Sequence, residues 1–241
     1  MMVCCCYYLL LGSFNTITAQ ANMRLETGTI GDLVNIANYL NTRNRPIDAL
    51  TFGNIAEGSL FFRDAWMPAT LEDAKGNLYR EVPVKLDLLD HRLYFLDRDG
   101  AVKEMMSSLE KITIRDSASG RVHVFLLVEG LAKAKTNSVA VWCEALETGK
   151  ALLLKKTTKT QTESIPYGGN LKTIFIRDAV FYYVKVEGRL YPVKREKDLE
   201  EILSKTVPSI RDFRSIGSNK EEQWKSMVGF YNEKIEKQTQ K

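Results

Sequence analysis

Between Trp66 and Val128 the apolar residues recur at every second position, which restricts this chain to folds built mainly from β-strands. In the clearest run, 82–88, valines and leucines occupy alternate positions. This pattern is typical of a strand with one face in the core and the other in water. The same reasoning predicts further strands at residues 93–96, 101–105, 112–114 and 122–128.

Short polar connections join these strands. Residues 97–100 have the sequence Asp-Arg-Asp-Gly, which suits a tight or bulged hairpin turn. The run shares two acidic positions with calcium-binding loops, but it lacks their third acid and their later Glu, so we interpret it as a hairpin. Because parallel strands need crossovers of a dozen or more residues, the short connections predict an antiparallel meander.

Two strands carry more specific expectations. Pro83 has no N–H to donate to a sheet, so its strand is expected to be an edge strand or to contain a bulge at that position. Nearly every residue of 122–128 is apolar, which predicts a strand buried on both faces.

A second group of strands follows. Residues 139–145 and 151–154 are predicted to form a hairpin. The polar run 155–161 is expected to end the second strand in solvent, with Lys155, Lys156 and Lys159 protecting a sheet edge rather than contacting an anionic surface. A turn cluster at 166–170 then precedes strands predicted at 172–176, 179–187 and 190–193.

Helical periodicity is confined to the two ends of the chain. Residues 29–40 have apolar positions spaced i, i+3, i+4, which predicts one N-terminal amphipathic helix. After Val193 the period changes to that of a helix, and about three C-terminal helices are predicted. They are expected around Leu199–Leu203, from Pro208 to a stop at Gly217, and onward from Ser218, which has capping-box spacing with Glu221.

The last of these helices carries one continuous apolar stripe, while its other face is rich in Glu, Lys and Gln. The stripe consists of Trp224, Met227, Val228, Tyr231 and Ile235. Leaving such a stripe in water is costly, so we expect the helix to dock on the β-domain. The alternative is that the stripe is presented to a partner protein.

The N-terminus predicts export. Residues 3–11 form an apolar block too short to span a bilayer, and Ala19-Gln20-Ala21 has the small-x-small form of a signal-peptidase site. Because no Lys or Arg precedes the block, an apolar N-terminus that stays attached is the alternative. We therefore divide the chain into a signal peptide at 1–21, a β-domain with its N-terminal helix at 22–195, and a docked helical segment at 196–241.

Composition and charge limit the kinds of partner. The chain has 241 residues and a formal net charge of +4, which divides into −2 over residues 1–154 and +6 over the remainder. This asymmetry is too mild for a nucleic-acid footprint, so we expect no nucleic-acid partner. No membrane span is expected in the mature chain, although the protein could be a component of the cell envelope.

Few residues suggest chemistry. Cys4, Cys5 and Cys6 lie in the apolar N-terminal block and behave as small hydrophobes, which leaves Cys143 as a lone thiol that is expected to be buried and structural. Neither His91, at a predicted turn, nor His123, in a predicted strand, has a partner at zinc-site spacing. We therefore predict no catalytic residue, no metal site and no cofactor.

Other features allow more than one interpretation. Phe61, Phe62 and Trp66 suit stacking on sugars or lipids, but packing at the entry to the sheet is the simpler explanation. A chain with 30 acidic residues offers many carboxylate pairs, and the sequence selects none of them as a catalytic acid and base. The ligand-binding residues therefore stay unknown at this point.

Several runs together resemble uncharacterised exported β-rich proteins of the Bacteroidota. They are residues 58–66, Gly76 with Tyr79, residues 84–88, Tyr182-Tyr183, Tyr231-Asn232 and the Ala-Gln ending of the signal. The resemblance would cover roughly residues 50 to 235 and consists of patterns of aromatic residues and glycines. It implies an exported protein with a β-rich fold, and it implies no activity.

The expected fold is therefore α+β and mainly β. It is an antiparallel meander sheet, sandwich-like or half-barrel-like, with one N-terminal helix and about three C-terminal helices.

The expected function is a non-enzymatic, exported binding or structural module in the periplasm or outside the cell. One alternative is a carrier of an apolar ligand in a curved sheet, which a pocket of Leu, Val and Phe with no filling helix would favour. Another is an enzyme whose site is invisible in the sequence, which a cleft with two strongly perturbed carboxylates would favour.

Overall fold

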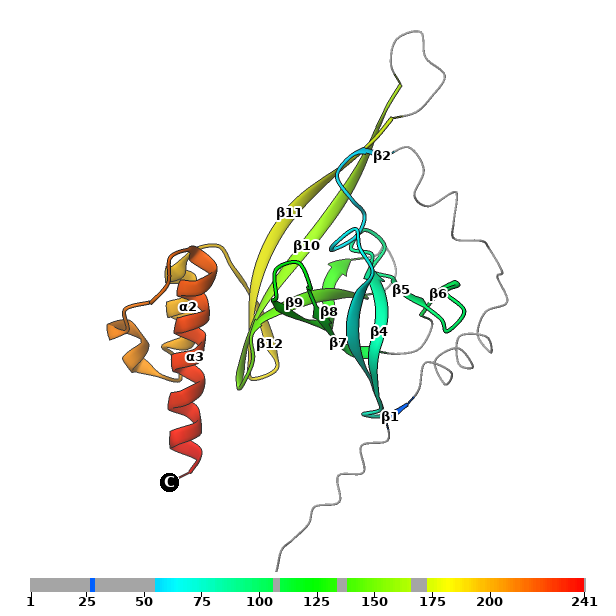
Figure 1. Cartoon of the computed structure of the whole chain (residues 1–241). Coiled ribbons are helices and arrows are strands. Elements are labelled where there is room, and N and C mark those ends of the chain that lie inside the picture. Colours follow the sequence, from blue (N-terminus) through cyan, green and yellow to red (C-terminus); the bar gives the residue numbers. More distant parts are fainter. Residues whose placement is uncertain (1–26, 29–54, 106–108, 134–137, 166–172, 241) are drawn as a thin grey trace, which may run out of the picture.

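The computed structural model describes residues 27–28, 55–105, 109–133, 138–165 and 173–240 (Figure 1). The signal segment 1–21, the N-terminal helix 29–40 and the turn cluster 166–170 lie outside these residues. The described chain is mainly β, as the sequence predicts, and two α-helices follow the strands.

The meander predicted from the period of two is confirmed. Its strands are β3 (Met67–Asp73), β4 (Leu78–Leu86), β5 (Leu93–Leu96), β6 (Val102–Glu104), β7 (Leu109–Arg115) and β8 (Val122–Lys133). The later strands are β9 (Ser138–Glu147), β10 (Ala151–Ser164), β11 (Thr173–Val186) and β12 (Arg189–Val193). Two short strands, β1 (Thr27–Gly28) and β2 (Ile55–Glu57), precede them.

The ten later strands form one open antiparallel sheet in the order β12-β11-β10-β9-β8-β7-β3-β4-β5-β6. Two consecutive meanders, β3 to β6 and β7 to β12, meet where β7 pairs with β3. Off this path, β1 pairs in parallel with β4, and β2 pairs in parallel with β11. The described strands thus make a single sheet and not the two packed sheets of a sandwich.

Pro83 occupies an interior strand, and two local features accommodate it. On the β3 side it lies opposite Pro68, which also lacks an N–H, so this pair needs no mutual hydrogen bond. On the other side β5 pairs only with residues 84–86, so Pro83 lies beyond the β5 ladder. The expected bulge does not lie at Pro83 itself: the register with β3 shifts two residues earlier in β4, beside Glu81 with its φ of 54°.

The prediction that 122–128 is buried on both faces is wrong. Phe125 is buried, but Val122 is 59% exposed and Leu127 is 39% exposed. Phe125 faces the core cluster of Ile112, Ile114 and Trp142. Leu126 and Val128 point to the opposite face of the sheet, where they are only half-buried. Leu127 shares the face of Phe125 and Val122 shares that of Leu126, so the continuous apolar sequence marks a strand that is incompletely covered on both faces.

The polar run 155–161 does not end its strand. β10 continues through it to Ser164 and pairs residue for residue with β11, which is one strand of 14 residues rather than two. Each lysine of the run has a partner, so the interpretation as a solvated edge is also wrong. Lys159 is buried and binds Asp178 at 2.8 Å, and Lys156 Nζ donates to the carbonyl of Leu131. Three threonines, which suit strands, and Gln161 fill the remainder of the run.

The C-terminal segment contains α2 (Glu196–Leu203), the 3-10 helix η1 (Pro208–Asp212) and α3 (Lys220–Thr239). The middle prediction thus corresponds to a short 3-10 helix, which begins at Pro208 as expected. The cap of α3 is Asn219 and not Ser218, because the Asn219 side chain accepts the N–H of Glu222 at 3.0 Å. Ser218 instead donates to the Glu222 carboxylate.

All three helices pack on one face of β10, β11 and β12, which we call the helix face (Figure 1). From the sheet, Ala151, Leu153, Val184, Val186 and Val193 point to it. The predicted stripe of α3 is buried there, with Trp224 only 1% exposed, while Ile235 is partly buried. The docking expected from the sequence is confirmed.

Asn232 joins α3 to the sheet through polar contacts. Its side chain accepts the N–H of Ala151 at 2.7 Å and donates to the carbonyls of Ala151 and Thr148. Gly149 lies so close that a Cβ there would collide with the Asn232 amide. The start of β10 and the middle of α3 are therefore fixed together.

Candidate functional site

The opposite face of the sheet carries a groove of about 650 Å³. Its apolar lining comes mainly from β8, β10 and β12, as Leu126, Val128, Leu152, Leu154 and Leu190. Beneath them Val141 and Cys143 of β9 are fully buried. We call this the groove face, and the α2, η1 and α3 helices lie on the other side of the sheet.

The groove requires the sheet to be concave on this face. Glu72 of β3 and Leu190 of β12 line the same hollow, although five other strands lie between β3 and β12 in the sheet order. Six strand spacings in a flat sheet would hold them about 29 Å apart. A hollow of this size therefore needs a curved sheet.

Charged side chains surround the apolar floor. Lys111 and Glu72 form an ion pair across β7 and β3. Glu110, Glu129 and Lys185 are exposed at the rim. An apolar floor with a few charged groups at the rim is the usual composition of a ligand site.

On the side of the sheet that carries the helices, a series of polar contacts lies between two apolar clusters. One cluster contains Phe125 and Trp142, and the other contains Val184 and Trp224. His123 Nδ1 lies 2.6 Å from Glu144 Oε1, and both side chains are largely buried. The edge of the Phe62 ring packs on the imidazole, with ring centroids 4.9 Å apart. His123 Nε2 is buried and has no hydrogen-bond partner among the described residues.

Glu221 of α3 extends this series of polar contacts. Lys155 Nζ lies 2.8 Å from Glu221 Oε1 and 4.0 Å from Glu144 Oε2, and the Tyr182 hydroxyl donates to Glu221 at 2.7 Å. Burial raises the pKa of Glu221, but the hydrogen bonds from Lys155 and Tyr182 outweigh it, so the net pKa is lowered. Burial, followed by the hydrogen bond to Glu221, raises the pKa of the Tyr182 hydroxyl. These contacts hold the first turn of α3 on the sheet.

The pair of His123 and Glu144 has the geometry of an oriented general base, because a carboxylate fixes one ring nitrogen and leaves the other free. A nucleophilic reaction would also need a hydroxyl or thiol in contact with that nitrogen. No hydrogen bond of this kind joins His123 to a described residue. Cys143 points to the groove face, away from it.

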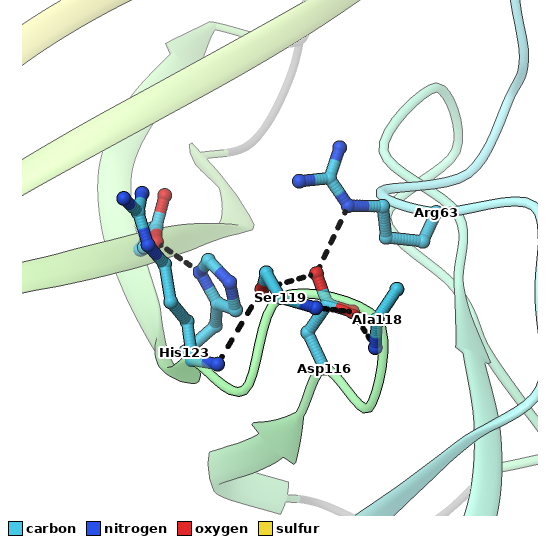
Figure 2. A network of polar contacts seen from close by, with 7 residues as sticks. Arg63, Asp116, Ala118, Ser119 and His123 are labelled. Carbon is cyan, nitrogen blue, oxygen red and sulfur yellow. Dashed lines mark hydrogen bonds and ion pairs between the residues drawn. The ribbon is translucent and has the colours of Figure 1, made fainter.

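Close to His123, Asp116 organises the turn between β7 and β8 (Figure 2). Its carboxylate accepts the N–H groups of Ala118 and Ser119 and the Ser119 hydroxyl, and Arg63 Nε lies 3.5 Å away. The Ser119 hydrogen bond leads the contributions that lower the pKa of Asp116. The hydrogen bonds from Ala118 and Ser119 close the turn, and the Arg63 contact ties the turn to the segment before β3, so the cluster is structural.

The residues singled out in the sequence are dispersed. Cys143 is fully buried, as predicted, and burial raises the pKa of its thiol to about 12. His91 lies at the turn between β4 and β5 with a φ of 56°. Its Nδ1 is buried, and burial followed by the charge of Lys156 lowers its pKa. The structure does not bring His91, His123 and Cys143 together.

Two other sequence interpretations are confirmed. Asp97 Oδ1 accepts the N–H groups of Asp99 and Ala101, which makes the acidic run a hairpin turn between β5 and β6. Phe61 is buried in a cluster with Leu60, Tyr94 and Ile176, so it belongs to the core.

Within the described ranges, no three His, Cys, Asp or Glu side chains are grouped closely enough to hold a metal ion. None of the described helices has the length and apolar character needed to cross a membrane. Comparison with models of protein families, with curated proteins and with solved structures finds no match to this chain. The groove, with its apolar floor and charged rim, is the candidate site.

Proposed function

We propose that this protein is a non-enzymatic binding module that works after export, in the cell envelope or outside the cell, with the groove as its ligand site. The observation that carries the proposal is the concave apolar hollow of about 650 Å³. This volume lies within the range of about 300 to 1,000 Å³ that is usual for small-molecule sites. The resemblance of several sequence runs to exported β-rich proteins supports the compartment.

The ligand class follows from the lining. Leu126, Leu152 and Leu190 offer apolar contact but no buried donor, so an alkyl or aromatic group fits the floor. Lys185 at the rim forms no ion pair with any described residue, and it can receive a carboxylate or sulfonate. The rim also carries the Glu110 and Glu129 carboxylates, so an amphipathic anion fits the groove only with its anionic group next to Lys185.

We also infer that the strands curve as a half-barrel, which would keep the groove hollow. Only five peptide units connect Glu104 of β6 with Leu109 of β7, and they reach about 18 Å at most. In a flat sheet these ends would lie about 19 Å apart sideways and about 20 Å apart along the strands. The short connection therefore supports strong curvature at this end of the sheet.

Titration with the anionic dye 1-anilinonaphthalene-8-sulfonate, followed by competition with decanoate, tests the site. Leu152→Gln and Lys185→Glu are expected to weaken dye binding by about tenfold each, because they remove an apolar contact or reverse the rim charge. Ile216→Gln is the matched control, since Ile216 is 74% exposed and does not line the groove. Equal dye affinity in all three variants would reject the groove as a ligand site.

Export has a separate test. Expressed in its native host, the protein is expected to lose about its first 21 residues, which intact mass spectrometry of the purified chain detects. A cytoplasmic species that still begins at Met1 or Met2 would contradict the export proposal and leave the groove proposal standing.

The pair of His123 and Glu144 favours a second candidate function, hydrolysis with His123 as a general base. A carboxylate with a raised pKa lies elsewhere. Burial raises the pKa of Asp87, whose side chain accepts the N–H groups of Leu89 and Asp90 within its turn. Hydrolysis of p-nitrophenyl acetate by the wild type and by His123→Gln tests the candidate. Equal rates in the two proteins would exclude this role.

A further inference from the structure

One edge of β11 is open between two short partners. β10 covers the whole length of β11 on one side. On the other side, β2 pairs with Ile174 and Phe175, and β12 pairs with residues 182–186. Gly58, just after β2, lies against the backbone of Ile176. No described residue pairs with Arg177–Phe181 on this side.

These five residues are exposed in succession, whereas Ile176 before them is buried and Tyr182 and Tyr183 after them are partly buried. Val180 is 44% exposed and Phe181 is 48% exposed. Neighbouring residues of a strand point to opposite faces, so the open edge carries one large apolar side chain on each face. Proteins usually protect free edges with charges or proline, and an apolar open edge is suited to pairing with another strand.

The register of the β11–β12 hairpin shows which backbone groups point outward. Glu187 and Gly188 form its two-residue turn and both have positive φ, which makes Val186 and Arg189 a hydrogen-bonded pair. Because the bonding direction alternates along an antiparallel strand, residues 184, 182, 180 and 178 share that direction. The free N–H and C=O groups are therefore those of Asp178 and Val180.

A hollow lies at each end of the open edge. The one beside β12 measures about 240 Å³ and includes Val180, Phe181 and Lys220 in its lining. The one beside β2 measures about 430 Å³ and includes Phe62, Arg63 and Asp178. Side chains of an added strand would have space at both ends.

The charges around the edge select the partner. Arg177, Lys194 and Lys220 form no ion pair within the described part of the chain, whereas the carboxylate of Asp178 is paired with Lys159 at 2.8 Å. The Lys220 ammonium lies over the Tyr182 ring, at the end of the edge. The free charges are thus positive, which opposes pairing with a second copy of the same edge and favours an acidic segment.

We propose that Arg177–Phe181 is a docking edge for an extended, acidic and apolar segment of a partner protein, which adds as a strand between β2 and β12. The segment would bond to Asp178 and Val180 through its backbone and cover Val180 and Phe181 with apolar side chains. This site is separate from the groove and does not depend on it, because the groove lining excludes all five residues.

Hydrogen exchange of the full chain tests the register directly. The amides of Asp178 and Val180 are expected to exchange fast, whereas those of Arg177, Ala179 and Phe181 are protected by pairing with β10. Protected amides at Asp178 and Val180 in the isolated monomer would mean that another part of this chain covers the edge, which would overturn the proposal.

A binding experiment uses a fluorescein-labelled heptapeptide of alternating glutamate and valine with a central phenylalanine. The wild type is expected to bind it, more weakly at high salt, and to slow exchange at Asp178 and Val180. Val180→Pro removes an outward N–H, and Phe181→Glu adds repulsion without touching the backbone. Each is expected to weaken binding about tenfold, whereas Val122→Glu, at another exposed apolar strand position, leaves it unchanged.

Three results would overturn the proposal. One is the absence of peptide binding by the wild type, and another is equal binding by Phe181→Glu. The third is a dimer in sedimentation equilibrium that Phe181→Glu dissociates, because the occupant would then be a second copy of this chain.

Discussion

The two faces of the sheet are built from the same strands and differ in what covers them. On the helix face, Val184 of β11 and Val228 of α3 are fully buried in one shared apolar cluster. On the groove face, Cys143 is equally buried, yet its neighbours Leu126 and Leu152 stay half-exposed to solvent. Strands with apolar residues on both faces thus create two surfaces to bury, and the described helices bury only one.

Trp224 supplies the largest test of this difference. It is 1% exposed, and its ring meets that of Tyr182 edge-on with centroids 5.2 Å apart. Trp224→Ala should cost about 3 to 5 kcal/mol of unfolding free energy, as truncation of a buried aromatic residue does. Urea unfolding measures it, with the exposed α3 variant Lys225→Ala as control. A loss below about 0.5 kcal/mol would show that the stripe does not anchor the helix.

Asn232 tests whether polar contacts also hold the helix face together. Asn232→Ala leaves the buried N–H and C=O of Ala151 without their side-chain partner. We expect a loss of about 2 kcal/mol in urea unfolding, because unsatisfied buried groups keep their desolvation penalty. A value equal to that of Lys225→Ala would mean that the neighbouring backbone satisfies Ala151 without the amide.

Cys143 is the corresponding test on the groove face. In a chain that starts at Asn22 it is the only thiol, and burial raises its pKa to about 12. At pH 8 only about one thiol in ten thousand is then ionised, so 5,5′-dithiobis(2-nitrobenzoate) should react slowly before urea is added and rapidly afterwards. Cys143→Ser should cost about 1 to 2 kcal/mol. Fast reaction of the folded protein would show that the groove floor is open to solvent.

Glu221 carries the smallest expected effect, and its sign depends on pH. Its folded pKa is lowered below 4.5, so the ionised carboxylate stabilises the fold above about pH 4.5 and loses this contribution as the pH falls through the folded pKa. Glu221→Gln should therefore cost about 1 kcal/mol at pH 7 and less at pH 3. Urea unfolding at the two pH values checks it, and a difference that grows toward low pH would contradict the assignment.

Much of the fold was predictable because its signals are local. The period of two between residues 66 and 128 and the stripe from Trp224 to Ile235 depend only on neighbouring residues, and both are confirmed. The length of β10 was not predictable from local signals, because its polar half is stable as a strand only when β11 lies beside it. The cap at Asn219 was missed by one position, since Ser218 is an equally good capping residue by type.

The candidate site was hidden for a different reason. Leu126, Leu152 and Leu190 come from three strands, and nothing in their spacing indicates that they line one hollow. The alternation of apolar residues in these strands predicts a buried face. The groove forms only because the sheet curves and brings β3 and β12 to the two sides of one hollow. The signal that could have pointed to it is the apolar character of both faces of 122–128, since the one long apolar stripe of the C-terminal helices can cover only one face.

The junction of β3 with β7 has a consequence for folding. Within each meander, successive strands are joined by short connections and can pair early, because little chain entropy is lost. The pairing of Ala69 with Ile114 instead closes a loop of more than 40 residues, so it is expected to form late. The core that contains Leu71 and Phe125 spans this seam, so it couples two meanders that would otherwise open as separate cooperative units.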